Sequence, residues 1–203
     1  MQSLLLVLGS FLLGSLPFSY WVARRASGAD LRTVGSGNPG ATNVLRVAGI
    51  WPATLALLLD IGKGVLPVAA SIQLQAGDLV VSVVAVAAIS GHILSPFLGL
   101  RGGKGVATSV GVLVVLNPLA SAGGVLIFLV LVLWKRYVSL ASMVGAVGIA
   151  ILASVAIDSG SAGKAGALAS VVIAILVLSR HLPNIKRLVA GQEPRLGEKV
   201  TQT

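Results

Sequence analysis

The sequence predicts an all-α polytopic membrane protein with seven transmembrane helices, its N-terminus outside and its C-terminus in the cytoplasm. Hydrophobic residues make up 56% of the 203 residues and charged residues only 10%, and the mean hydropathy is +0.98. Average globular domains carry about 25% charged residues. This chain therefore has too few charges to cover a water-exposed surface, and at this length we expect one compact helical bundle.

Apolar segments of spanning length occur along the whole chain, since about 20 apolar residues cross a bilayer. The first is expected at 3–23. No basic stretch precedes it, while Arg24 and Arg25 follow it, which argues against a cleaved signal peptide and places the N-terminus outside. Proline disfavours helix at the residue before it, so Asn117–Pro118 is expected to divide the apolar run 106–134 into two short helices. The remaining spans are expected at 44–73, 79–98, 138–157 and 165–180.

The distribution of cations supports seven spans. With this topology every Lys and Arg lies on the cytoplasmic side, except Lys63 within a span and Lys164 in the outer loop 158–164. A single helix over 106–134 would instead place Lys135 and Arg136 outside. The net charge of +9 is thus explained by membrane topology and anionic lipid. Nucleic acid is not an expected partner, because no basic run is interleaved with aromatic residues.

Composition also excludes several kinds of chemistry. The chain has no cysteine and only two histidines. A disulfide framework, a thiolate nucleophile and a cysteine-ligated metal are therefore impossible, and a multi-histidine metal site is not expected.

Residues 34–43, VGSGNPGATN, contain the pattern G-x-G-x-x-G, and Asp60 follows at about the distance of a ribose-binding acid. A dinucleotide fold needs a strand before these glycines, whereas here a membrane helix precedes them, so no dinucleotide is expected. Backbone amides before a helix that starts near Pro39 still predict an anion site, with a ligand-free capping loop as the alternative. The side chains that would contribute to this site are Ser36, Asn38, Thr42, Asn43 and Arg46.

A second glycine-rich segment, LRGGKGVATS, also precedes an apolar helix. It resembles a P-loop but lacks the first glycine, and Gly105 follows Lys104 where Ser or Thr would bind magnesium. Gly102 and Gly103 beside Lys104 predict a nest of amides suited to an anion. An ordinary cytoplasmic cation is the alternative.

A third polar segment, RHLPNIKRLVAGQEPR, begins where the last span ends. It brings His181 and Asn184 to the same side of the membrane as the two glycine segments. A lone interfacial histidine is more often structural than catalytic. Three polar clusters on one face of a bundle with few other polar residues nevertheless predict one shared site.

These segments resemble the bacterial acyl-phosphate-dependent glycerol-3-phosphate acyltransferases, the PlsY family. The resemblance is carried by GSGNPGATNVLRVAG, GHILSPFLGLRGGKGVATSVG and HLPNIKRLVAGQEPR, with SLPFSYWVAR and RYVSLASM in support, and covers nearly the whole chain in order. It implies a single transmembrane acyltransferase domain over residues 1–203. This domain is expected to lie in the bacterial cytoplasmic (inner) membrane as a multi-pass protein, with its active site facing the cytoplasm.

The resemblance implies transfer of a fatty acyl group from acyl phosphate to the 1-hydroxyl of glycerol 3-phosphate. The products would be 1-acylglycerol 3-phosphate (lysophosphatidic acid) and phosphate, in the first acylation step of phospholipid synthesis. Two phosphorylated substrates suit two anion sites, and an acyl chain suits a groove between helices. No cofactor or metal is expected. The expected partners are acyl phosphate, glycerol 3-phosphate and membrane lipids, with the soluble enzyme that supplies acyl phosphate as a candidate.

The resemblance and the charges together assign the candidate site residues. The expected catalytic residues are His181, Lys104 and Ser36. The residues expected to bind glycerol 3-phosphate are Ser36, Arg46, Lys104, His181 and Asn184. Those expected to bind the acyl-phosphate head are Gly102, Gly103, Lys104, Thr42 and Asn43. Asn38 and Ser142 are further candidate substrate-binding residues.

The expected reaction needs no acyl-enzyme. The H-x-x-x-x-D motif of acyl-CoA-dependent acyltransferases is missing, because Phe97 and Lys186 stand where an aspartate would follow His92 and His181. Acyl phosphate is a mixed anhydride with a good leaving group, so direct attack by the glycerol hydroxyl is the simplest hypothesis. Two proton acceptors are open, the imidazole of His181 and a phosphate oxygen of a substrate.

Four further polar residues have expected supporting positions. Ser139 and Ser142 open the sixth span and are expected to face the site, with helix capping and packing as the alternative. His92 is expected to orient the second glycine segment. Glu193 is expected to brace the tail against Arg187 or another cation.

Two other function classes are alternatives to the enzyme. A transporter of phosphorylated solutes is favoured by Asp60 and Lys63, which are expected to form a buried ion pair inside a span, with function and packing both open as its role. No internal repeat is apparent, however, and the cations gather on one side of the membrane instead of at its midplane. A scaffold that recruits soluble lipid-synthesis enzymes would leave the glycine segments unexplained.

Overall fold

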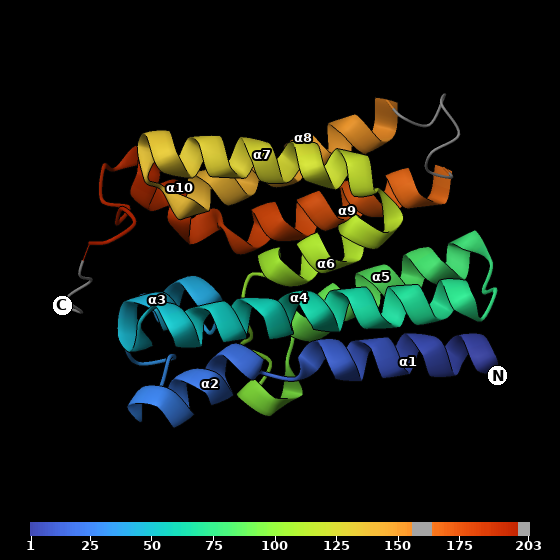
Figure 1. Cartoon of the computed structure of the whole chain (residues 1–203), viewed down its shortest axis with the longest axis horizontal. Helices are drawn as coiled ribbons and strands as arrows, with labels where there is room; N and C mark the ends of the chain where they lie inside the picture. Colours follow the sequence, from blue (N-terminus) through green and yellow to red (C-terminus); the bar gives the residue numbers. More distant parts are fainter. Residues whose placement is uncertain (156–163, 199–203) are drawn as a thin grey trace.

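The computed structural model describes residues 1–155 and 164–198, and every regular element in these ranges is helical (Figure 1). The elements are α1 (Gln2–Ser15), α2 (Phe18–Ser27), α3 (Ala41–Ala48), α4 (Ile50–Gln73), α5 (Asp78–Ile93), the short 3-10 helix η1 (Pro96–Leu98), α6 (Val106–Leu116), α7 (Pro118–Lys135), α8 (Val138–Val155), α9 (Lys164–Arg180) and α10 (Leu182–Val189). Residues 156–163, which hold most of the expected outer loop, lie outside the described ranges.

Within the described ranges, five helical stretches are long and apolar enough to cross a membrane. They are Gln2–Ser27, Ile50–Gln73, Asp78–Leu98, Pro118–Lys135 and Val138–Val155. The pair α9 and α10, bent by 57°, makes a sixth candidate if it is counted as one span. α6 has 11 residues and rises about 16 Å, roughly half of the hydrocarbon thickness of about 30 Å. The chain is thus a multi-pass membrane protein, but the predicted span at 106–116 is a half-length helix.

The first predicted helix is broken. We expected one helix over 3–23, but α1 ends at Ser15 and α2 begins at Phe18, because Pro17 has no amide hydrogen to continue the ladder. The carbonyl groups at the break find side-chain donors. Ser95 Oγ donates to Ser15 O at 2.6 Å, and Lys63 Nζ donates to Leu16 O at 2.8 Å.

Two other helix boundaries bear on the predictions. The expected helix 44–73 is divided at Gly49, whose φ of 86° lies in the left-handed region that favours glycine, and α3 begins at Ala41. The expected break at Asn117–Pro118 is confirmed, since α6 ends at Leu116 and α7 begins at Pro118.

Three helix pairs, α1 with α5, α4 with α6 and α7 with α8, approach each other closely at glycines. A Cβ on Gly14 would overlap the carbonyl of Ala88, and a Cβ on Gly91 would overlap the carbonyl of Phe11. The glycines at the three contacts are Gly14, Gly91, Gly64, Gly111, Gly124 and Gly145. Small residues at these crossings let the backbones of the membrane helices approach closely.

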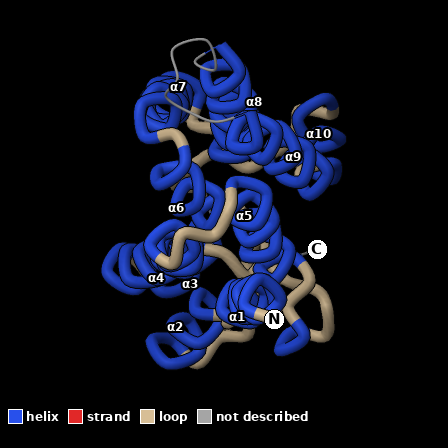
Figure 2. Tube along the Cα trace, turned by 90° about the vertical axis from the view of Figure 1, so that its right-hand side faces the viewer, coloured by secondary structure: helices blue, strands red, loops and turns tan. Residues whose placement is uncertain are grey.

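The helices form two groups with α6 between them. α1, α2, α4 and α5 lie on one side of α6, and α7, α8 and α9 lie on the other (Figures 1 and 2). Large aliphatic side chains such as Leu58, Leu66, Leu126 and Leu133 are exposed on the outside, where lipid would surround them. The N-terminus lies at one end of the bundle, and α3, α10 and the C-terminal tail lie at the other (Figure 1).

Candidate active site

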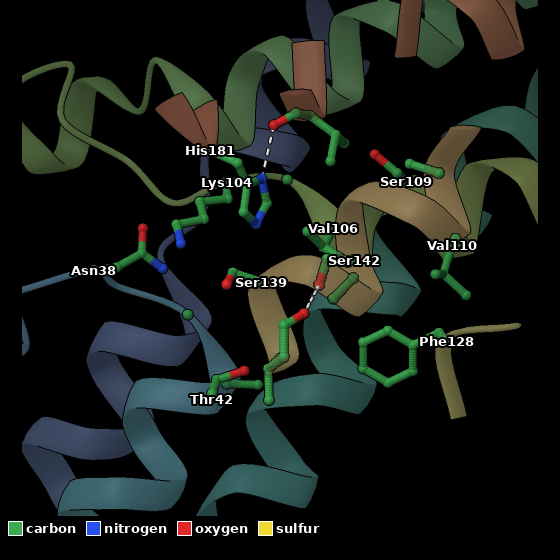
Figure 3. A pocket seen from close by; sticks show the side chains of 18 of the residues that line it. Asn38, Thr42, Lys104, Val106, Ser109, Val110, Phe128, Ser139, Ser142 and His181 are labelled. Atoms are coloured by element: carbon green, nitrogen blue, oxygen red, sulfur yellow. Dashed lines mark hydrogen bonds between the residues drawn. The ribbon is translucent and has the colours of Figure 1, made fainter. Parts of the chain in front are cut away.

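A cavity of about 370 Å³ lies between the two groups of helices (Figure 3). Its polar lining includes Ser36, Asn38, Thr42, Asn43, Arg46, Lys104, Ser142, His181, Asn184, Arg187 and Glu193. Its apolar lining includes Leu57, Ile61, Val106, Val110, Leu113, Val125, Phe128, Leu129 and Ile149. The three sequence segments predicted to share a site therefore meet at one cavity, and α4, α6, α7 and α8 supply its apolar wall.

The first glycine segment reaches the cavity through a loop that is fastened to α3. Asn43 is buried in the first turn of α3. Its Oδ1 accepts the Ser36 amide hydrogen at 2.9 Å, and its Nδ2 donates to Leu31 O at 3.2 Å and to Val34 O at 3.0 Å. The side-chain amide of Asn43 is thus occupied by the loop that presents Ser36, and it is not the free donor to substrate that the sequence predicts.

The second glycine segment is docked onto the end of α5. The Gly102 amide donates to Ile93 O at 3.0 Å, and the Gly103 amide donates to His92 O at 3.2 Å. A Cβ on Gly102 would overlap the His92 carbonyl, and one on Gly103 would overlap the His92 ring. The prediction that these two glycines offer their amides to a phosphate is therefore wrong. Their amides instead hold the loop that carries Lys104.

His92 contacts the loop that carries Lys104, as expected. Its backbone carbonyl accepts a hydrogen bond from the Gly103 amide, and its Nδ1 lies 3.2 Å from Thr108 Oγ1 on α6. The residue is buried, and its contacts join the end of α5, the loop and the start of α6. These contacts confirm that His92 orients the second glycine segment.

Lys104 begins a chain of polar contacts across the cavity. Its Nζ donates to Asn184 Oδ1 at 2.6 Å, and Asn184 Nδ2 donates to Glu193 Oε1 at 2.6 Å. Glu193 also accepts from Ser139 Oγ at 2.6 Å and from Arg187 Nε at 2.8 Å. The expected contact of Glu193 with Arg187 is confirmed, and Ser139 faces the site through the same carboxylate. No local spacing predicts the contacts of Lys104 with Asn184 and of Ser139 with Glu193, since each joins segments far apart in the sequence.

His181 lies at the bend between α9 and α10 and is buried. Its Nδ1 is 2.8 Å from Val177 O (Figure 3). A carbonyl oxygen can only accept, so Nδ1 carries the hydrogen and Nε2 is left as an acceptor. Two other predicted residues, Asn38 and Thr42, also line the cavity.

The electrostatics of the site favour an anion. Burial lowers the pKa of Lys104 to about 8, with Glu193 opposing the shift and Arg187, Arg46 and Arg180 reinforcing it. Burial raises the pKa of Glu193, but hydrogen bonds from Ser139, Asn184 and Arg187 outweigh this effect and the net shift is downward. Glu193 is therefore ionised and committed to Asn184 and Arg187. Arg46 and Lys104 remain as the cations that a substrate would meet.

The predicted ion pair inside a span is confirmed. Lys63 Nζ lies 2.9 Å from Asp60 Oδ1, and both side chains are buried. Ser19 Oγ donates to Asp60 Oδ2 at 2.6 Å, and Lys63 Nζ also donates to Leu16 O. The pair links α4 to the broken α1–α2 segment next to the cavity, so its contacts favour a packing role over a solute path.

Comparison with known proteins identifies the family of the chain. The family model described as glycerol-3-phosphate acyltransferase matches residues 4–191. A glycerol-3-phosphate acyltransferase of Halalkalibacterium halodurans is 45% identical over 98% of this chain and 98% of its own length. One of Synechococcus sp. (strain CC9902) is 43% identical over 98% of each chain.

Two crystal structures of PlsY, an integral membrane glycerol 3-phosphate acyltransferase, are also similar. The glycerol 3-phosphate form has a TM-score of 0.89 and 37% identity, and the lysophosphatidic acid form has a TM-score of 0.87 and 34% identity. Each comparison covers 97% of this chain and 96% of the other. The chain therefore belongs to the glycerol-3-phosphate acyltransferase family and is an integral membrane acyltransferase of phospholipid synthesis.

Proposed function

We propose that this enzyme transfers a fatty acyl group from acyl phosphate to the 1-hydroxyl of glycerol 3-phosphate, releasing lysophosphatidic acid and phosphate. The observation that carries the proposal is one cavity that joins cationic and polar side chains to an apolar groove between membrane helices. Such a cavity suits two phosphorylated substrates, one of which has a long hydrocarbon chain. Cationic segments gather at the end of the bundle where α3 and α10 lie, and we therefore place the site at the cytoplasmic face of a bacterial inner membrane.

The cations and amides at the polar end divide between the two substrates. We assign Ser36, Arg46, Lys104, His181 and Asn184 to glycerol 3-phosphate. We assign Asn38, Thr42 and again Lys104 to the head of acyl phosphate. Lys104 is placed between both groups because its ammonium, held by Asn184 at 2.6 Å, has further hydrogens to donate.

Transfer proceeds by direct attack. The glycerol 1-oxygen forms a bond to the acyl carbonyl carbon, the bond from that carbon to the phosphate oxygen breaks, and phosphate leaves with the electron pair. The protein orients the two substrates and stabilises the developing charge, and effects of this kind are worth several kcal/mol each. No acyl-enzyme is needed, because the anhydride already carries a good leaving group.

The hydroxyl proton has two acceptors in this scheme, His181 Nε2 and a substrate phosphate oxygen. His181→Ala separates them. A loss of kcat with an unchanged KM for glycerol 3-phosphate would identify His181 as the base. A rise in that KM with retained kcat would identify it as a binding group.

The direct test is the product balance. Purified enzyme in detergent, given acyl phosphate and glycerol 3-phosphate, is expected to form lysophosphatidic acid and phosphate in equal amounts, with Lys104→Ala as the inactive comparison. Uptake of phosphate esters into protein-containing vesicles without acylated product would overturn the proposal in favour of transport.

A further inference from the structure

Ser109 presents a buried hydroxyl without a partner at the wall of the cavity. The residue lies in α6, is 5% exposed, and its Oγ has no hydrogen-bond partner within residues 1–155 and 164–198. It lines the cavity and is seen in Figure 3. Burying an unpaired hydroxyl costs free energy, so native structures nearly always pair one. A bound molecule is the partner that this site can receive.

The face of α6 on which Ser109 lies is directed into the cavity. Val106, Ser109, Val110 and Leu113 recur at helical spacing, and all four line the cavity. Thr108, on another face of the same helix, instead contacts His92 at 3.2 Å. The Ser109 hydroxyl is therefore not needed to hold α6 against its neighbours.

Ser109 also lies where the polar part of the cavity passes into the apolar part. Lys104 precedes α6 on the polar side, whereas Leu113, about 6 Å further along the helix axis, belongs to the apolar wall. The nearby hydroxyl of Ser142 already donates to Val138 O at 2.8 Å, and that of Ser139 donates to Glu193. Ser109 thus keeps a free proton at this boundary.

An acyl phosphate has the same order of parts, with a charged phosphate, then a carbonyl, then a hydrocarbon chain. If the phosphate lies among the cations and the chain in the groove, the carbonyl lies at the boundary. We propose that Ser109 Oγ donates a hydrogen bond to the acyl carbonyl oxygen and stabilises the negative charge that develops on it during transfer. This inference rests on the acyl-phosphate reaction proposed above.

In this step Ser109 acts only as a hydrogen-bond donor to the carbonyl oxygen. As the glycerol oxygen bonds to the carbonyl carbon, the π electron pair moves onto the oxygen held by Ser109. The pair returns when the carbon–oxygen bond to phosphate breaks. The hydroxyl proton of glycerol passes to His181 Nε2 or to a phosphate oxygen, and Ser109 neither loses its proton nor forms a covalent bond.

Replacing Ser109 with alanine tests the proposal against a matched control. Ser121 in α7 is also buried with an unpartnered hydroxyl in the described structure, but it does not line the cavity. We expect Ser109→Ala to lower kcat about 100-fold, as loss of one oxyanion donor does, with the KM for glycerol 3-phosphate unchanged. Ser121→Ala is expected to keep wild-type kcat, and Ser109→Thr, which retains the hydroxyl, to recover most of the loss.

A binding measurement makes the test independent of turnover. An acyl phosphonate inhibitor retains the carbonyl, whereas an alkyl phosphate of the same length lacks it. Ser109→Ala is expected to weaken inhibition by the acyl phosphonate up to about tenfold and to leave inhibition by the alkyl phosphate unchanged. Unchanged kcat in Ser109→Ala, or an equal change for both inhibitors, would overturn the inference while the wild type still uses acyl phosphate. A wild-type enzyme that does not use acyl phosphate would overturn the proposed function itself.

Discussion

The ammonium nitrogen of Lys104 lies 2.6 Å from the side-chain oxygen of Asn184, 80 positions further along the chain. This contact joins the loop before α6 to α10, and Glu193 extends it to Ser139 at the start of α8. Lys104, Asn184, Glu193 and Ser139 therefore form one connected network at the polar end of the cavity. Changes at one member are expected to reach the substrate through the position of the Lys104 ammonium.

Removing the partner of Lys104 tests this network. We expect Asn184→Ala to raise the KM for glycerol 3-phosphate about 10- to 100-fold, because a hydrogen bond to a charged group is worth about 1.5–3 kcal/mol. Asn117 is the matched control, since it is buried and donates to Ser170 Oγ at 3.1 Å outside the cavity. Steady-state kinetics in which Asn184→Ala behaves like Asn117→Ala would contradict the account.

The pH dependence of the reaction should report Lys104. Its pKa of about 8 means that the ammonium is charged below that pH and neutral above it. We expect kcat/KM for glycerol 3-phosphate to fall as the pH rises through about 8 in the free enzyme. Lys104→Arg keeps its charge and should lose this alkaline limb in the same pH profile. An identical limb in both enzymes would assign the titration to another group.

The close contact between α1 and α5 at Gly14 should be sensitive to added side-chain volume. Gly14→Ala places a Cβ against the backbone of Ala88, and overpacking of this kind costs about 1–3 kcal/mol. Gly9, in the same helix, has no heavy atom near the position of a Cβ, so Gly9→Ala should be neutral or slightly stabilising. Thermal unfolding in detergent compares the two variants. Equal melting temperatures would show that this crossing is looser than the structure indicates.

The buried pair of Asp60 and Lys63 should be sensitive to removal of one partner. Lys63→Met leaves the Asp60 carboxylate uncompensated, and breaking a buried pair in this way costs about 3–5 kcal/mol. The double variant D60N/K63M, which removes both charges, is expected to unfold with a smaller loss. The exposed pair of Arg32 and Asp30 provides the comparison, because Arg32→Met should change stability little. A double variant no more stable than K63M would argue against the pair as the cause.

Much of the architecture could be predicted from local sequence. The apolar runs predicted membrane helices, and Pro118 predicted the end of α6, because lipid exposure and proline both act on short stretches of chain. Pro17 indicates a helix break in the same way, but the apolar residues on both sides of it favour one continuous span. The stability of the break depends on Ser95 and Lys63, which no local pattern connects to it.

The candidate site was predictable as a set of segments more than as a set of roles. Ser36, Lys104, His181 and Asn184 reach one cavity as expected. The backbone amides of Gly102 and Gly103 and the side-chain amide of Asn43 instead make internal hydrogen bonds. The sequence alone does not distinguish a glycine or asparagine that binds substrate from one that holds a loop. Ser109 belongs to an apolar helix whose cavity-facing side is set by packing, so only its missing partner distinguishes it.

The identity of the acyl donor tests the central claim most directly. Acyl phosphate, acyl-CoA and acyl carrier protein thioesters of one chain length can be compared with glycerol 3-phosphate in a single assay of lysophosphatidic acid formation. We predict product from acyl phosphate, with one phosphate released for each product formed. Product from a thioester but not from acyl phosphate would contradict the account.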